Sequence, residues 1–98
     1  MKDNLKGVGI WGQRHYQYLK ENKPSVIGAM RLNGSIIPYL QSVDEQADEM
    51  VFQLVKQFAK QEGVSEDLKR RDQMAWVGAM NNIRDRVNEI ALSEVIFV

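Results

Sequence analysis

The chain has 98 residues, its 13 basic residues are balanced by 13 acidic ones, and 44% of its residues are hydrophobic. This composition is typical of one ordinary globular domain and excludes a disordered or fibrous chain. Because there is no cysteine, a disulfide framework, a thiolate metal site and a cysteine nucleophile are all excluded. The net charge of zero also disfavours a protein that coats nucleic acid by bulk attraction.

Neither a membrane span nor a signal peptide is predicted. No stretch approaches the roughly 18 apolar residues of a membrane-spanning helix, and no apolar run follows residues 1–6. We therefore expect a cytoplasmic protein that does not enter a membrane. A domain of this length buries only about 60 to 65% of the surface of its unfolded chain, so its own core is small.

The first part of the chain predicts short helices. Apolar residues recur at helical spacing over residues 11–22, and Pro24 then begins a second helix that reaches Leu32 and stops at Asn33-Gly34. The alternative is a single helix over residues 11–32 that is kinked at Pro24. The pattern is compatible with both.

Two long helices are predicted after Gly34. Apolar residues alternate in steps of four and three, first at Ile36, Leu40, Val43, Ala47, Met50 and Leu54, and again at Trp76, Met80, Ile83, Val87 and Ile90. Such a heptad pattern keeps one apolar stripe of each helix, here called the seam, against a partner helix. Ser35 is the expected N-cap of the first helix and Gly63 its end, and Ser65 is the expected N-cap of the second helix.

The link between the long helices has only two residues, 63–64, so the helices must be antiparallel neighbours in a hairpin about 40 Å long. A register centred on this link pairs residues whose numbers sum to about 127, for example Val43 with Ile83. The expected fold class is all-α. The chain is expected to be one domain over residues 1–98, with one or two short helices over 1–34, the hairpin over 35–93 and an apolar tail over 94–98, where the alternation also fits a short strand.

Five short motifs follow one another along the chain. They are GIWGQRH at residues 9–15, YLKE at 18–21, DEQA at 44–47, QMAWV at 73–77 and MNNIR at 80–84. In this order they resemble the transposon-encoded TnpV family of small bacterial proteins over nearly the whole chain. The resemblance implies an accessory role on a mobile genetic element, and it transfers no enzymatic activity or catalytic residue to this chain.

The N-terminal part of the chain is basic. Residues 1–43 hold six basic and two acidic side chains, and the resulting charge of +4 is cancelled by a later acidic group. The candidates for contacts with nucleic acid are Arg14, His15, Lys20, Lys23 and Arg31. His15 is the only histidine, but as a general base it would need an orienting carboxylate, and Glu21 at i+6 lies off its helical face. A structural or surface role is favoured for His15, and no catalytic residue is predicted.

The acidic group consists of Asp44, Glu45, Asp48 and Glu49. Carboxylates grouped in this way could bind a divalent cation. Metal sites in helical bundles, however, combine carboxylates with histidine on facing helices, and this region has no histidine. We therefore expect either pairing with Arg84 and Arg86 across the hairpin or a solvated acidic face, and neither a metal nor a cofactor.

A polar stripe beside the seam of the last helix holds Asn81, Arg84 and Asn88 at spacings i, i+3 and i+7. Two asparagines inside a helix are unfavourable and require a reason. One interpretation is a recognition surface, since Asn and Arg side chains read base edges. The favoured interpretation is a ledge that supports the N-terminal loop around Gly7 and Gly12.

The apolar residues beyond the seam predict a partner. Phe52, Val55 and Phe58 spread around more of the first long helix than one facing helix can cover, and the tail adds Val95 and Phe97. A second copy of the chain is the preferred partner, so a homo-oligomer, most simply a dimer, is expected.

The expected function is that of a non-catalytic accessory or regulatory protein of a mobile element. It would bind a protein, either a second copy of itself or another protein that the element encodes. The alternative is a DNA-binding regulator or recombination accessory factor that uses the basic N-terminal segment.

Overall fold

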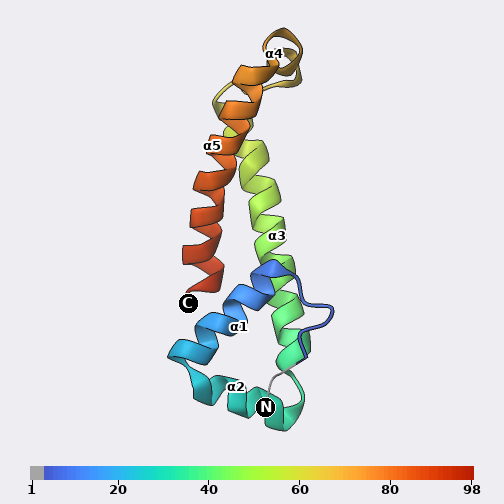
Figure 1. The fold of residues 1–98 in the computed structure, drawn as a ribbon, viewed down its shortest axis with the longest axis vertical. Helices are drawn as coiled ribbons and strands as arrows, with labels where there is room; N and C mark the ends of the chain where they lie inside the picture. The colour runs from blue at the N-terminus through green and yellow to red at the C-terminus, as the bar shows by residue number, and fades with distance from the viewer. Residues whose placement is uncertain (1–3) are drawn as a thin grey trace.

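The computed structural model describes residues 4–98 (Figure 1). Residues 1–3, which belong to the basic segment and to the stretch considered for a signal peptide, lie outside this range. The elements are α1 (Ile10–Asn22), α2 (Pro24–Asn33), α3 (Ile36–Gln61), α4 (Glu66–Arg71), α5 (Gln73–Ala91) and the π-helical turn η1 (Leu92–Ile96). Because residues 4–98 form helices and loops without a strand, the all-α expectation is confirmed. None of the helices in this range is both long and apolar enough to cross a membrane.

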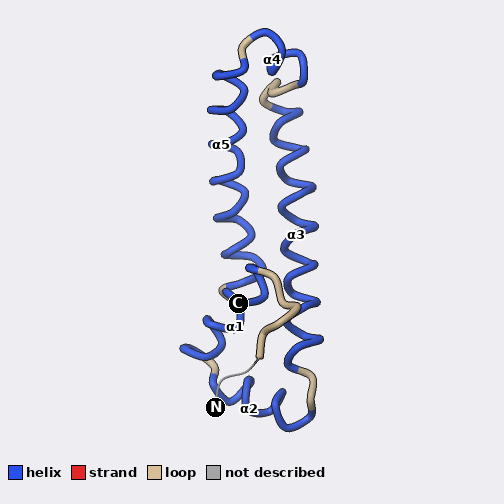
Figure 2. The backbone as a smooth tube through the Cα atoms, turned by 45° about the vertical axis from the view of Figure 1, so that its right-hand side comes forward, coloured by secondary structure: helices blue, strands red, loops and turns tan. Residues whose placement is uncertain are grey.

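The helices form an elongated body of 55 × 22 × 18 Å. α3 and α5 run side by side in opposite directions, as Figure 2 also shows, and α4 lies at their far end. α1, α2 and η1 gather around the beginning of α3. The N-terminal end of the molecule is therefore several layers thick, whereas the end that carries α4 has only the α3–α5 pair.

The boundary between α1 and α2 resolves the alternative that the sequence left open. Lys23 has an extended φ of −141° and separates two distinct helices, and its backbone N–H donates to the Leu19 carbonyl at 2.7 Å. Pro24 then starts α2, where its missing amide hydrogen removes no hydrogen bond of the helix. Gly34 ends α2 in the left-handed conformation, with φ at 74°, as the Asn33-Gly34 pair predicts.

The second long helix of the sequence analysis is in fact two helices. The Ser65 side chain accepts from the Leu68 N–H at 3.2 Å and caps α4, as expected. Asp72, with φ −150° and ψ 85°, then interrupts the helix, and its carboxylate accepts from the Ala75 N–H at 3.1 Å to cap α5. The prediction of one continuous helix was wrong because Asp72, which directly follows the last residue of α4, is the N-cap of a new helix. Ser35 precedes α3, but its side chain makes no capping bond.

The register of the α3–α5 pair also differs from the prediction. Val43 and Ala47 pack with Ala91 and Val95 in one buried cluster. Ile83 belongs to a different cluster, with Met80 and Val87, which contacts Val51, Leu54, Val55 and Phe58. The expected pairing of Val43 with Ile83 was therefore wrong, because α4 takes up residues at the connection and moves α5 along α3.

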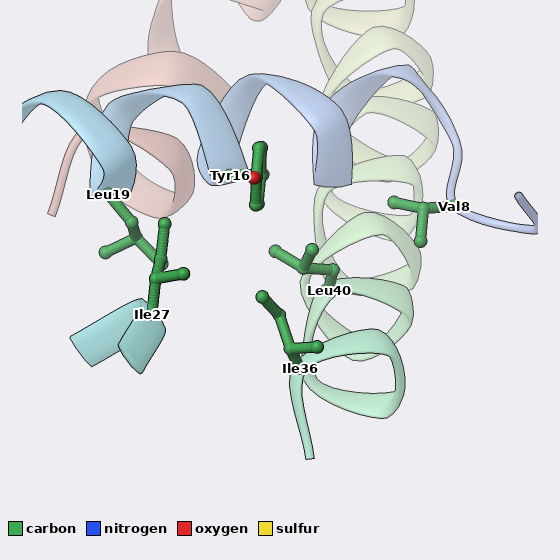
Figure 3. Close-up of a cluster of buried hydrophobic side chains, with 6 residues drawn as sticks. All are labelled: Val8, Tyr16, Leu19, Ile27, Ile36 and Leu40. Carbon is green, nitrogen blue, oxygen red and sulfur yellow. The ribbon is translucent and has the colours of Figure 1, made fainter. Parts of the chain in front are cut away.

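A third cluster forms the core of the N-terminal end (Figure 3). Its side chains come from the loop before α1, from α1 and α2, and from the start of α3, where Leu40 is fully buried. They are Val8, Tyr16, Leu19, Ile27, Ile36 and Leu40. The short helices thus cover the first turns of α3 and leave its second half to α5 alone.

Candidate interaction surfaces

His15 lies in the interior, with 1% of its surface exposed. Its Nδ1 is 2.7 Å from the Ile96 carbonyl and its Nε2 is 2.8 Å from the Tyr39 hydroxyl. Because a carbonyl can only accept, Nδ1–H donates to Ile96, and Nε2 shares a second hydrogen bond with the Tyr39 hydroxyl. Burial raises the pKa of Tyr39, which keeps this hydroxyl protonated. Both ring nitrogens are used inside the protein, so the suggested contact of His15 with nucleic acid is withdrawn in favour of its structural role.

The other candidate cations are exposed on α1, on α2 and at Lys23 between them. Arg14 lies over the Trp11 ring, 5.2 Å from its centroid, and Arg31 donates to the Tyr16 hydroxyl at 3.5 Å. Lys20 and Lys23 are exposed near the end of α1. The structure therefore leaves Arg14, Lys20, Lys23 and Arg31 on the surface of the N-terminal end.

The C-terminal residues divide between core and surface. Val95 is 4% exposed and belongs to the buried cluster of Val43, so its assignment to a partner surface is corrected. The π-helical turn η1, rather than a strand, carries Val95 and Ile96 inward. Phe97 remains 52% exposed, with its ring centroid 5.6 Å from that of Tyr18.

Phe97 borders a groove of about 370 Å³ between α1 and the C-terminal residues. The groove is lined by Arg14, Gln17, Tyr18, Glu21, Leu92 and Phe97. No local sequence pattern indicates this groove, because its two walls come from opposite ends of the chain. Only the helical face shared by residues 14, 17, 18 and 21 could have indicated one wall.

The acidic group divides between a solvated face and one structural contact: Glu45, Asp48 and Glu49 are exposed, as the second interpretation expects. Asp44 accepts a hydrogen bond from the Gly12 N–H at 3.1 Å and so caps α1. Arg86 pairs instead with Glu62, at 2.7 Å. The predicted pairing of the acidic group with Arg86 is therefore wrong, since the shifted register brings Arg86 near the end of α3. Within residues 4–98, no three potential ligand side chains are grouped as a metal site would require.

The polar stripe does not support the N-terminal loop. The Gly7 carbonyl accepts from the Gln41 side-chain amide at 3.3 Å, so the loop rests on α3. Asn81 and Arg84 are exposed on α5, and Asn88 is half-buried there. The ledge interpretation was wrong because the loop meets the first half of α3 rather than the last helix.

A second groove, of about 430 Å³, lies at the end of the molecule that carries α4. Its apolar walls come from α3, α5 and the link before α4, and polar residues surround them. The lining residues are Val55, Lys56, Ala59, Lys60, Val64, Ser65, Glu66, Trp76 and Met80. Trp76, which the heptad pattern placed in the core, is half-buried in this wall, and the Lys69 ammonium lies 4.6 Å from its ring centroid.

The α3–α5 pair leaves further apolar surface open around this groove. Phe52 is 57% exposed, and Val55 and Phe58 are half-buried. On α5, Met74 is 81% exposed and Val77 is 37% exposed. Two helices alone cannot cover such side chains, because each shields only one side of the other.

Comparison with known proteins identifies the lineage of the chain. The profile of a family described as "Transposon-encoded protein TnpV" matches residues 1–96. No curated protein and no solved structure matches the chain.

Proposed function

The chain belongs to the TnpV family of transposon-encoded proteins, and from this premise we propose that it is a non-catalytic accessory or regulatory protein of its mobile element. It acts in the cytoplasm as a helical interaction module that binds a protein. The observation that carries the proposal is the open apolar surface of the α3–α5 pair, centred on the groove beside Trp76.

Physical chemistry favours a partner on this surface. Apolar area that leaves water stabilises a complex by about 25 cal/mol per Å², and a small two-helix end cannot bury that area internally. Val55, Ala59 and Trp76 provide apolar walls, while Lys56 and Lys60 provide charge at the rim. An apolar centre with a polar rim is the usual anatomy of a protein interface.

Affinity capture from a host that carries the element tests this proposal. A tagged chain should recover a second, untagged copy or another protein of the element, and nuclease treatment should leave the recovery unchanged. Val55→Glu places a charge in the apolar wall and should abolish the recovery of another protein of the element, whereas Gln57→Glu, an exposed change on the same helix, should not. Recovery that disappears with nuclease, or recovery of another protein of the element that survives Val55→Glu, would contradict the proposal.

A DNA-binding regulator remains the second candidate. The four exposed cations of α1 and α2, Arg14, Lys20, Lys23 and Arg31, favour it, because such side chains contact phosphates. Under this alternative, DNA of defined sequence is recovered with the tagged chain, and the double change Arg14→Ala with Lys20→Ala removes it.

A further inference from the structure

One solvent-facing stripe of α3 has an ordered distribution of charge. Glu45, Glu49, Phe52, Lys56 and Lys60 follow one another in steps of four, three, four and four, so they share one face of the helix. All five are exposed, and Phe52 is 57% exposed. The stripe therefore reads acidic, acidic, aromatic, basic, basic, with Phe52 at its centre.

The charges on this stripe are not satisfied within the chain. Glu45 and Glu49 are like charges at i, i+4, as are Lys56 and Lys60, and both arrangements destabilise an isolated helix. None of these four residues forms an ion pair with any residue in 4–98. Glu49 accepts only from the neutral Gln53 amide, at 2.9 Å, and the Lys56 ammonium lies 5.1 Å from the Phe52 ring centroid.

We propose that a second copy of the chain docks on this stripe, with its α3 antiparallel to the first and the two-fold axis beside Phe52. This inference rests on the proposed function, since it names one protein that the module binds. In this arrangement Glu45 faces Lys60 of the second copy, and Glu49 faces Lys56 of the second copy. The two Phe52 rings meet at the centre of a contact that runs for about 22 Å along α3.

The charge pattern selects this arrangement over its alternatives. Parallel α3 helices in register would place Glu45 against Glu45 and Lys60 against Lys60, which is unfavourable. The antiparallel arrangement brings an opposite charge to each of the four residues and relieves both like-charge pairs. The charges of the stripe on one copy are thus complementary to those of the same stripe on the other copy, as a two-fold interface requires. Because both copies use the same surface, the assembly stops at a dimer.

Charge exchange between chains tests the pairing. Glu49→Lys and Lys56→Glu should each weaken self-association at least about tenfold, because each places like charges opposite one another twice. An equimolar mixture of the two variants should associate as well as the wild type, because in the mixed dimer every facing pair is opposite in charge. The double change Glu49→Lys with Lys56→Glu in one chain should restore the homodimer as well. Sedimentation equilibrium from about 1 to about 300 μM measures all of these.

Matched controls separate this effect from folding and from net charge. Asp85→Lys and Arg84→Glu make the same charge changes at exposed positions of α5, which the pairing does not use, and should leave self-association unchanged. Circular dichroism should give the same helix content for all four variants. If the mixture associates no better than its components, or if the α5 controls weaken association equally, the proposed pairing is overturned.

A cross-link tests the position of the axis. Cα atoms that face each other across helices with axes about 10 Å apart are about 5 Å apart, which is within disulfide range. The chain has no cysteine, so Phe52→Cys should oxidise to a disulfide-linked dimer and Gln57→Cys, on another face of α3, should not.

A wild-type chain that remains monomeric at all concentrations would overturn this pairing, and capture of another protein of the element through the Trp76 groove would still be expected. Loss of that capture alone would contradict the proposed function instead.

Discussion

Asp44 of α3 caps the first turn of α1 across 32 residues of sequence, with its Oδ1 3.1 Å from the Gly12 nitrogen. This contact requires the two helices to approach closely. A Cβ built on Gly12 would lie 2.7 Å from the Leu40 carbonyl, and one built on Gly9 would collide with the Asp44 carboxylate. The two glycines therefore allow the close docking of α1 on α3.

Gly12→Ala should lower the free energy of unfolding by about 1 to 3 kcal/mol, because the added Cβ meets the Leu40 backbone, which cannot move aside. Urea unfolding measures the change. Gly28→Ala is the matched control: it lies inside α2, its Cβ would meet nothing within 4 Å, and it should stabilise by about 0.5 to 1 kcal/mol. Equal effects of the two changes would mean that α1 is not docked as described.

Stability should depend on the ionisation of Tyr39 at alkaline pH. Burial raises the pKa of Tyr39 above its ordinary value of 10.0, so folding favours the protonated hydroxyl. The stabilisation is complete below about pH 10 and is lost as the pH rises through the raised pKa. Urea unfolding between about pH 8 and about pH 11 should therefore show a steeper decline for the wild type than for Tyr39→Phe. Tyr18→Phe should retain the steep decline, and a wild-type slope equal to that of Tyr39→Phe would contradict the prediction.

Ile83 and Trp76 should differ in their contribution to stability, although both lie on the apolar seam. Ile83 is fully buried, so Ile83→Ala should cost about 2 to 5 kcal/mol. Trp76 is half-buried in a groove wall, so Trp76→Ala should cost about 1 to 2 kcal/mol, less than a core tryptophan would. Thermal and urea unfolding measure both. A larger loss of unfolding free energy for Trp76→Ala than for Ile83→Ala would show that Trp76 is a core residue, as the heptad pattern predicted.

Salt separates the two candidate functions. If the exposed cations of α1 and α2 bind DNA, the logarithm of the binding constant should fall with the logarithm of salt concentration by about 0.9 per phosphate contacted. Arg14→Ala and Lys20→Ala should then each reduce this slope by about one. Binding of another protein through the apolar Trp76 groove should change much less over the same range. Sub-micromolar DNA binding at about 0.15 M salt that Arg14→Ala with Lys20→Ala abolishes would favour the DNA-binding regulator.

Local features were readable from the amino-acid order. The all-α class follows from the heptad spacing of α3 and α5, and the ends of α2 and α3 follow from Gly34 and Gly63, whose φ values are 74° and 70°. Such signals depend on a residue and its nearest neighbours along the chain. Asp72 is also a residue type that favours a helix N-cap, but the helical periodicity continues on both sides of it and so predicted an unbroken helix.

Other features were decided by contacts between distant residues. Whether His15 faced solvent or the interior depended on Ile96, 81 residues away, and the role of Asp44 depended on the backbone of Gly12. The register of α3 against α5 depended on where α4 placed the turn. Heptad spacing specifies which face of a helix is apolar, but it leaves the sliding position of one helix along another undetermined, and only the packing of complementary side chains sets that position.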